Sequence, residues 1–331
     1  MSDHRWVVTC DPGVDDAVAL AVAAGRADCD VRAVVAGAGN VDAATAWRNA
    51  AGLVALFGLD VPVGIGSAVA LGGATLARGA DPRPKGEHRP HGVSPHRGDS
   101  QRDGGGHGRD GLGGLSDRLP AVSDTPADAA RLVRGQVIAL GPLTDVALAR
   151  RAGRPIERVV WMGGTIGWTA PSDRSDSYVG PGRPTGPASP GEPASEFNAS
   201  ADVGAVDEVL KARLDVSIVP IDVTRQVTLD RTALDRWDAG PAAARLCAAL
   251  VRTRRRAGSF VLHDPVAVVA ALEPDLFTWQ LRPVRCSTSD VYPRGVLLSA
   301  PKRSGPARVA VAVDAVAVRR RIAAAVAALP G

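Results

Sequence analysis

Aromatic residues are scarce in this 331-residue chain, at 4% of the total, so a buried core must consist mainly of Val, Ala and Leu. The scarcity also argues against nucleic-acid binding, because the net charge of +4 is spread along the chain without interleaved aromatics. The hydrophobic content of 45% and the charged content of 22% are ordinary for a folded soluble protein. The length suffices for one large α/β domain or two small domains.

Cysteine is also rare. The four cysteines are far apart and form no C-x-x-C pair, which is typical of reduced, buried thiols in a cytosolic protein: Cys10, Cys29, Cys247 and Cys286. The first residues, M-S-D-H-R-W, lack the apolar region of a signal peptide. No uncharged apolar run reaches the roughly 18 residues that a membrane span requires. We therefore expect a cytoplasmic protein with no membrane partner.

Hydrophobic periodicity is absent from two long stretches, 72–114 and 168–195, which are rich in Gly, Pro and polar residues. We predict that both are mobile loops that flank the functional site, the first of them as a lid. A zinc site in the first loop is a weaker alternative, because the histidine spacings fit no standard site and no cysteine is nearby. That loop contains four of the six histidines, namely His88, His91, His96 and His107.

Elsewhere, short apolar runs alternate with helical patterns. Helices are predicted to begin at Asp42, an N-cap residue, and at Thr125-Pro126. The spacing favours right-handed βαβ units, and no internal repeat or linker divides the chain. The predicted fold class is α/β, with one domain over residues 1–331 and an open, mostly parallel sheet flanked by helices. The strands of this sheet are predicted at 7–10, 31–36, 61–65, 136–140, 158–162 and 216–221.

Three aspartates follow the first predicted strand, in the stretch V-V-T-C-D-P-G-V-D-D-A-V-A-L. Pro12 and Gly13 favour a tight turn there, so Asp11, Asp15 and Asp16 lie at the carboxyl end of a strand, where open α/β sheets bind ligands. The helix dipole could stabilise Asp15 and Asp16, whereas a hard cation such as Ca²⁺ would neutralise all three carboxylates. The EF-hand pattern is absent, and these residues alone leave both interpretations open.

Further polar residues follow the other predicted strands. Each alone has a plain structural explanation, since Asn40 suits a turn and Glu196 or Asn198 could cap the next helix. Because the carboxyl ends of parallel strands converge, their joint placement predicts one cleft. The set comprises Asn40, the turn at Leu140, Met162, Glu196, Asn198, His263 and Asp264.

The aspartate stretch D-P-G-V-D-D-A-V-A-L resembles the amino-terminal signature of the inosine-uridine-preferring nucleoside hydrolases, D-x-D-P-G-x-D-D-A. The motifs G-N, A-L-G-P-L-T-D, M-G-G, S-E-F-N, D-V-T and L-H-D-P then follow in the order of that family. The segment H-G-R-D-G-L-G-G, from His107, resembles the mobile active-site loop of the family. The resemblance extends from Val7 to about Leu329 and implies a Rossmann-like nucleoside hydrolase fold.

The resemblance implies hydrolysis of the N-glycosidic bond of a nucleoside, with Asp11 as general base and His263 as general acid. Within the loop, His107 is the next candidate for the acid. The resemblance also implies a homodimer or homotetramer. The implied Ca²⁺ ligands are Asp11, Asp16, Asp264 and the backbone carbonyl of Leu140, and the implied nucleoside contacts are Asp15, Asn40, Met162, Glu196, Asn198 and His107.

Two departures from the family pattern concern the substrate. Thr9 replaces the leading aspartate of the signature, and the asparagine that contacts the ribose 5′-hydroxyl is missing, with Pro190 nearest its position. The sequence therefore does not rank inosine, uridine, cytidine or adenosine. A hydrolase of another ribosyl compound is one alternative. A non-catalytic ribose-binding or nucleoside-binding protein is another, although binding alone needs neither a base at Asp11 nor an acid at His263.

Overall fold

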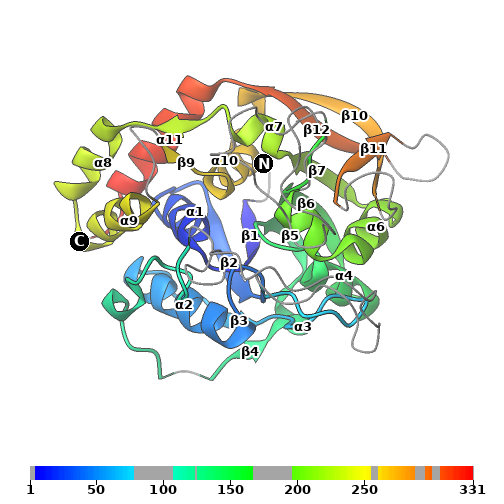
Figure 1. The fold of residues 1–331 in the computed structure, drawn as a ribbon, viewed down its shortest axis with the longest axis horizontal. Helices are drawn as coiled ribbons and strands as arrows, with labels where there is room; N and C mark the ends of the chain where they lie inside the picture. Colours follow the sequence, from blue (N-terminus) through cyan, green and yellow to red (C-terminus); the bar gives the residue numbers. More distant parts are fainter. Residues whose placement is uncertain are drawn as a thin grey trace, which may run out of the picture.

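A ten-stranded, mostly parallel sheet runs through the molecule in the order β11-β10-β12-β7-β6-β5-β1-β2-β3-β4 (Figure 1). The computed structural model describes residues 4–77, 107–123, 125–166, 196–254, 260–287, 295–299 and 306–330. The parallel strands are β1 (Arg5–Cys10), β2 (Asp30–Ala36), β3 (Val63–Ile65), β4 (Ala127–Asp128), β5 (Gly135–Ala139), β6 (Ile156–Met162), β7 (Asp215–Val219) and β12 (Pro306–Val313). Antiparallel pairing joins β10 (Phe277–Cys286) to β12 and to β11 (Leu297–Ser299).

The order of the strands reverses beside β1. From β1 the chain proceeds outward through β2, β3 and β4 on one side, and β5, β6 and β7 follow on the other side. A reversal of this kind opens a crevice at the carboxyl ends of the two strands involved, here β1 and β5. The turns after Cys10 and Ala139 therefore face each other across the crevice.

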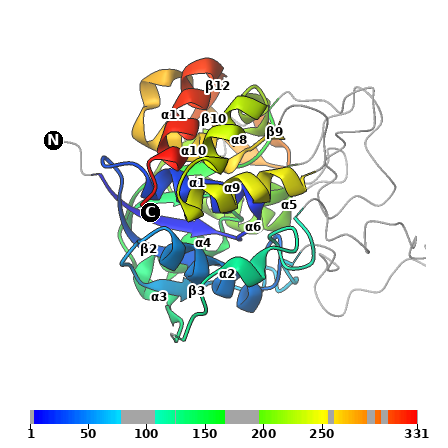
Figure 2. The ribbon, with the colours of Figure 1, turned by 90° about the vertical axis from the view of Figure 1, so that its left-hand side faces the viewer.

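Helices cover both faces of the sheet. On one face lie α1 (Val14–Ala24), α2 (Ala43–Leu56), α8 (Arg231–Asp238), α9 (Ala242–Thr253), α10 (Asp264–Leu272) and α11 (Ala315–Ala327). On the other face lie α3 (Ala129–Leu132), α4 (Thr144–Arg151) and α6 (Val203–Lys211). Figure 2 shows α9 and α11 beside α1, and α8 packs against α9 and α11. Within the described ranges, no helix is long and apolar enough to cross a bilayer.

The two hydrophobic layers follow from the alternation of side chains along each strand. In β6, Val160 and Met162 pack into the layer that contains α1, whereas Val159 and Trp161 pack into the layer that contains α4. This is the period of two expected for a strand buried on both faces. The predicted α/β class and the mostly parallel sheet are confirmed.

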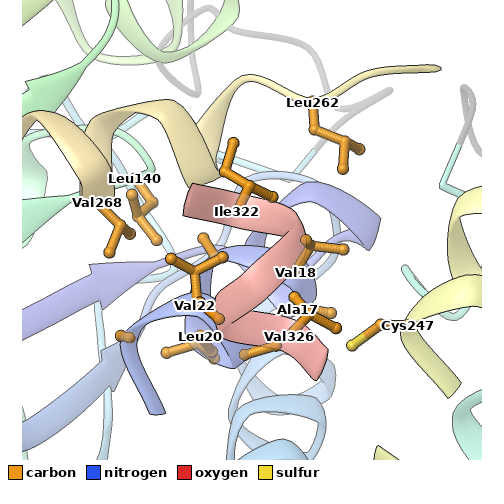
Figure 3. Close-up of a cluster of buried hydrophobic side chains, with 14 of the residues drawn as sticks. Ala17, Val18, Leu20, Val22, Leu140, Cys247, Leu262, Val268, Ile322 and Val326 are labelled. Carbon is orange, nitrogen blue, oxygen red and sulfur yellow. The ribbon is translucent and has the colours of Figure 1, made fainter. Parts of the chain in front are cut away.

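Helix α1 is enclosed on all sides, with ten of its eleven residues buried. Its side chains Val18 and Val22 pack among those of the C-terminal helix, including Ile322 and Val326 (Figure 3). At its end, a Cβ on Gly25 would lie 1.9 Å from the carbonyl oxygen of Ala325, so only glycine allows this approach. The helix that follows the aspartate turn is therefore fixed between the sheet and α10 and α11.

The starts of two predicted elements differ from the structure, and two short helices were not predicted. The helix expected at Thr125-Pro126 begins instead at Ala129, because Asp128 caps it by accepting a hydrogen bond from Ala130 N at 3.0 Å. The third strand is shorter than predicted and begins at Val63. Two short helices were missed, α5 (Phe197–Ala201) and α7 (Ile221–Thr224), because four or five residues are too few to show helical periodicity.

Asp145 provides a test of how burial affects stability. Its carboxylate accepts a hydrogen bond from Ser67 N at 2.9 Å, and burial raises its pKa to about 6. When folding raises the pKa of a carboxyl group, the folded state is most stable relative to the unfolded state below the unfolded pKa. This part of the free energy of unfolding is lost as pH rises towards 6. We expect Asp145→Asn to be more stable than the wild type at pH 8 by roughly 1–3 kcal/mol.

The advantage of Asp145→Asn should shrink as pH falls and vanish near pH 4, where both side chains are neutral. Urea unfolding at pH 4, 6 and 8 measures it. A variant that is no more stable than the wild type at pH 8 would contradict the burial of an ionisable group at this position.

Candidate active site

A solvent-open pocket lies at the carboxyl ends of the parallel strands. It gathers nearly every site residue predicted from sequence, from segments spread across the chain. Asp16 is the exception and lies completely buried, within hydrogen-bond contact of the turn that contains Asp11. The lining residues are Asp11, Asp15, Asn40, His107, Leu140, Met162, Glu196, Phe197, Asn198, Ile221, Arg254, His263 and Asp264.

Asp16 organises the turn between β1 and α1. Its carboxylate accepts hydrogen bonds from Asp11 N at 3.2 Å and from the amide of Gly13, the N-cap residue of α1, at 2.9 Å. Asn40, from the turn after β2, donates from Nδ2 to the carbonyl oxygen of Asp11 at 3.1 Å. Asp16 thus lies in the first turn of α1 and bonds to the turn that holds Asp11 at the crevice.

Asp11 is 1% exposed and accepts a hydrogen bond on Oδ2 from Asn40 N at 2.7 Å. Its carboxylate is enclosed by glycines from two neighbouring strand ends. A Cβ on Gly39 would lie 1.9 Å from Oδ2, and a Cβ on Gly141 would lie 2.8 Å from Oδ1. The G-N and A-L-G-P motifs thus leave room for this carboxylate.

Gly39→Ala should displace Asp11. The added methyl group overlaps Oδ2, and an error of about 1 Å in a catalytic group can cost roughly 10²-fold in rate. We expect a loss of that order in kcat/KM. The matched control is Gly72→Ala, since a Cβ there meets nothing within 4 Å and should leave the rate unchanged. Equal rates for the two variants would show that the position of Asp11 is unimportant.

Asp15 links three segments of the pocket. Its Oδ1 pairs with the guanidinium of Arg254 at the end of α9, and its Oδ2 accepts a hydrogen bond from His263 N at 3.0 Å. Burial alone would raise the pKa of Asp15, but Arg254 and the histidines His263 and His107 outweigh burial, so the pKa is lowered. Asp15 is therefore an ionised acceptor on the pocket wall.

Two other carboxyl groups are shifted in the opposite direction. Burial, with a further contribution from Asp15, raises the pKa of Asp16 to about 7. Burial and then repulsion from Asp16, Asp15 and Asp11 raise the pKa of Asp264 well above its usual range. The pocket thus concentrates more negative charge than Arg254 alone can balance.

A hard cation fits this donor chemistry. The groups present are the carboxylates of Asp11, Asp16 and Asp264 and the carbonyl oxygen of Leu140, which accepts one hydrogen bond from Asn198 Nδ2 at 2.8 Å and retains a second lone pair. The carboxylates of Asp11 and Asp16 also accept hydrogen bonds from backbone amides and retain further lone pairs. Among the described residues, no three His, Cys, Asp or Glu side chains form a ready-made metal site.

Glu196 and Asn198 have structural roles and also line the pocket. Glu196 caps α5, accepting from Asn198 N at 2.8 Å and Ala199 N at 2.9 Å, and it also accepts from Gly164 N at 2.8 Å. Asn198 Nδ2 bridges two strand ends, through the carbonyl oxygens of Leu140 and Met162. Glu196 is thus a helix cap, whereas Asn198 lies within α5 and joins two strand ends, and both residues also line the pocket.

His107 is 4% exposed and accepts a hydrogen bond on Nδ1 from Val14 N at 2.9 Å, at the start of α1. The segment after it is ordered by Asp110, whose carboxylate accepts from the amides of Leu112, Gly114 and Ser116. The described end of the first loop therefore flanks the pocket, as predicted. His88, His91 and His96, the rest of that loop and residues 168–195 lie outside the described residues, so the zinc alternative and loop mobility stay predictions.

Sequence reasoning missed three residues of the pocket: Arg254, Phe197 and Ile221. Arg254 belongs to the run R-T-R-R-R, which reads as an ordinary solvated helix end. Phe197 stands inside the S-E-F-N motif, so its place beside Glu196 and Asn198 was the available signal. Ile221 ends an apolar strand pattern and gave no signal of its own.

Known proteins similar to this chain are nucleoside hydrolases. The family model described as inosine-uridine preferring nucleoside hydrolase matches residues 6–320. Uridine nucleosidase 1 of Arabidopsis thaliana is 27% identical over 310 residues, covering 87% of this chain and 80% of that protein. The pyrimidine-specific ribonucleoside hydrolase RihA of Shewanella oneidensis is 28% identical over 300 residues, covering 83% and 79%.

Solved structures agree on the fold. A plant nucleoside hydrolase, PpNRh1, superposes with a TM-score of 0.75 at 24% identity, covering 98% of this chain and 99% of that one. A purine-preferring ribonucleoside hydrolase from Gardnerella vaginalis gives 0.75 at 22% identity, covering 98% of each.

Proposed function

Because the chain belongs to the inosine-uridine preferring nucleoside hydrolase family, we propose that it hydrolyses the N-glycosidic bond of ribonucleosides to free base and ribose. One observation carries the proposal: Asp11, Asp15, Asn40, Asn198, His263 and Asp264 line a single pocket. This brings together a candidate base, hydroxyl acceptors and a candidate acid.

The ribose is held by polar groups at the strand ends. Asp15, whose pKa is lowered, is an ionised acceptor for a hydroxyl hydrogen. Asn40, Glu196 and Asn198 lie on the same wall and supply further polar contacts. Cleavage passes through a state with oxocarbenium character, so carboxylates close to the sugar also stabilise the developing positive charge.

Asp11, Asp16, Asp264 and the carbonyl of Leu140 would hold Ca²⁺, which supplies charge neutralisation and lowers the pKa of a coordinated water when bound. Asp11 accepts the proton of the attacking water as general base. Its fixed position between Gly39 and Gly141 keeps the carboxylate at the crevice. The family is one of metalloenzymes, and this all-oxygen donor set suits Ca²⁺, as it would Mg²⁺ or Mn²⁺.

His263 donates the proton that the leaving base requires. The C–N bond breaks with its electron pair on the base nitrogen, and the proton from the imidazole neutralises that nitrogen. Water delivers hydroxyl to the anomeric carbon, and its remaining proton resides on Asp11. The products are the neutral base and ribose.

The named relatives differ in preference, some being pyrimidine-specific and one purine-preferring. A panel of inosine, uridine, cytidine and adenosine, with detection of free ribose, tests the proposal and ranks the bases. We expect turnover that disappears after chelation and returns with Ca²⁺.

Binding of a nucleoside by calorimetry without release of ribose would support a binding protein instead. Release of ribose only from ribosyl compounds other than nucleosides would favour a hydrolase of such a compound. A homodimer or homotetramer stays a prediction.

A further inference from the structure

Thr224 lies directly behind the candidate acid. It is completely buried, at the end of the short helix α7, and its Oγ1 is 2.7 Å from Nδ1 of His263. The helix follows β7, and its first residue, Ile221, lines the pocket. The sequence motif D-V-T gave no chemical role to this threonine.

The hydrogen bonds around Thr224 define its role. Its hydroxyl also lies 3.5 Å from the carbonyl oxygen of Ile221, a long contact to which it can donate. The Thr224 hydroxyl and the Nδ1 of His263 are both hydrogen-bonded when Nδ1–H donates to Oγ1 and the hydroxyl hydrogen points to the carbonyl oxygen of Ile221. The ring is then held with its Nδ1 edge towards α7.

We propose that Thr224 is a positioning residue that orients the imidazole of His263, so that Nε2 delivers the proton to the leaving base. The inference rests on the proposed function. Because Nδ1–H is bonded to Thr224 before and after the transfer, the proton that moves is the one on Nε2. The neutral ring that remains keeps its bond to Thr224.

The main chain of His263 is held separately. Its backbone amide donates to Oδ2 of Asp15 at 3.0 Å, at the start of α10. This bond fixes where the residue stands but leaves rotation about the side-chain torsions free. Thr224 removes that rotation, so the two contacts together determine the position of Nε2.

The test compares Thr224→Val, which keeps the shape and loses the hydroxyl, with Thr224→Ser, which keeps the hydroxyl. On a nucleoside, we expect Thr224→Val to lower kcat by roughly 10–10²-fold with little change in KM, because Thr224 positions the acid without touching substrate. Thr224→Ser should stay within about 3-fold of wild type. On p-nitrophenyl riboside, whose anion leaves unaided, both variants should resemble the wild type.

A matched control is Thr144→Val. Thr144 is also buried, in the first turn of a helix, and its hydroxyl donates to Asp202 at 2.7 Å, far from His263 in sequence. The control should lower the melting temperature while leaving the ratio of the two substrate rates unchanged. In a His263→Ala background, Thr224→Val should add no further loss.

Nitrogen NMR of the histidine ring gives a readout without turnover. We expect an Nδ1–H tautomer for His263 in the wild type and in Thr224→Ser, and a mixture in Thr224→Val. Unchanged tautomers, or equal losses on both substrates, would overturn the role of Thr224. A wild type that released no ribose would instead overturn the proposed function and leave the NMR result to decide the orientation of the ring.

Discussion

Asp11→Ala is expected to abolish turnover on every nucleoside. The substitution removes both the general base, worth about 10²–10⁴-fold, and one carboxylate of the proposed cation site. The loss should therefore reach about 10⁴-fold or more. It should not depend on the leaving base, because activation of water is common to all substrates. Initial rates with inosine, uridine and p-nitrophenyl riboside measure it.

Calorimetry with Ca²⁺ tests the role of Asp11 in the proposed cation site directly. Asp11→Asn keeps the shape of the side chain, yet it should bind Ca²⁺ more weakly than the wild type and remain inactive. Asp42→Ala is the control, because this exposed aspartate caps α2 and is not among the residues that line the pocket, so its loss should affect stability. Retained turnover in Asp11→Asn would remove Asp11 from the mechanism.

His263→Ala should lose activity selectively. It removes protonation of the leaving base, so a natural nucleoside should be cleaved roughly 10²–10⁴-fold more slowly. The p-nitrophenyl riboside should be cleaved nearly as fast as by the wild type, since its leaving group needs no proton. The ratio of the two rates is the quantity to measure.

Equal losses on both substrates would show that His263 is structural. The acid would then be sought at His107, which lines the same pocket. His107 accepts a backbone hydrogen bond on Nδ1, so its only ring proton in that arrangement is on Nε2. His107→Ala measured with the same two substrates distinguishes the candidates.

Much of the site was predictable because its signals are local. Pro12, Gly13 and Asp16 define the aspartate turn within a few residues of one another, and Asp42 marks the start of a helix as predicted. The convergence of the polar residues follows from parallel strands, whose carboxyl ends share one edge. The sequence therefore predicted the pocket without knowledge of any contact.

The parts that were missed depend on distant contacts. Arg254 gains its role from pairing with Asp15, 239 residues away, and nothing in its neighbourhood distinguishes it from other helix-end arginines. For Glu196 the sequence analysis treated helix capping and a place in the pocket as alternatives. In the structure the carboxylate caps α5 and also lines the pocket. Thr224 likewise acts only through its contact with His263.

The distance along the chain between Asp15 and His263, 248 residues, affects how the protein is made. At a synthesis rate of about 5–20 residues per second, the aspartate turn leaves the ribosome roughly 10–50 s before α10. Helix α1 packs against α10 and α11, so its apolar surface stays uncovered during that time. The first residues synthesised are thus among the last to be fully buried. A chain truncated before α10 would therefore expose an apolar helix and would lack His263 and Asp264.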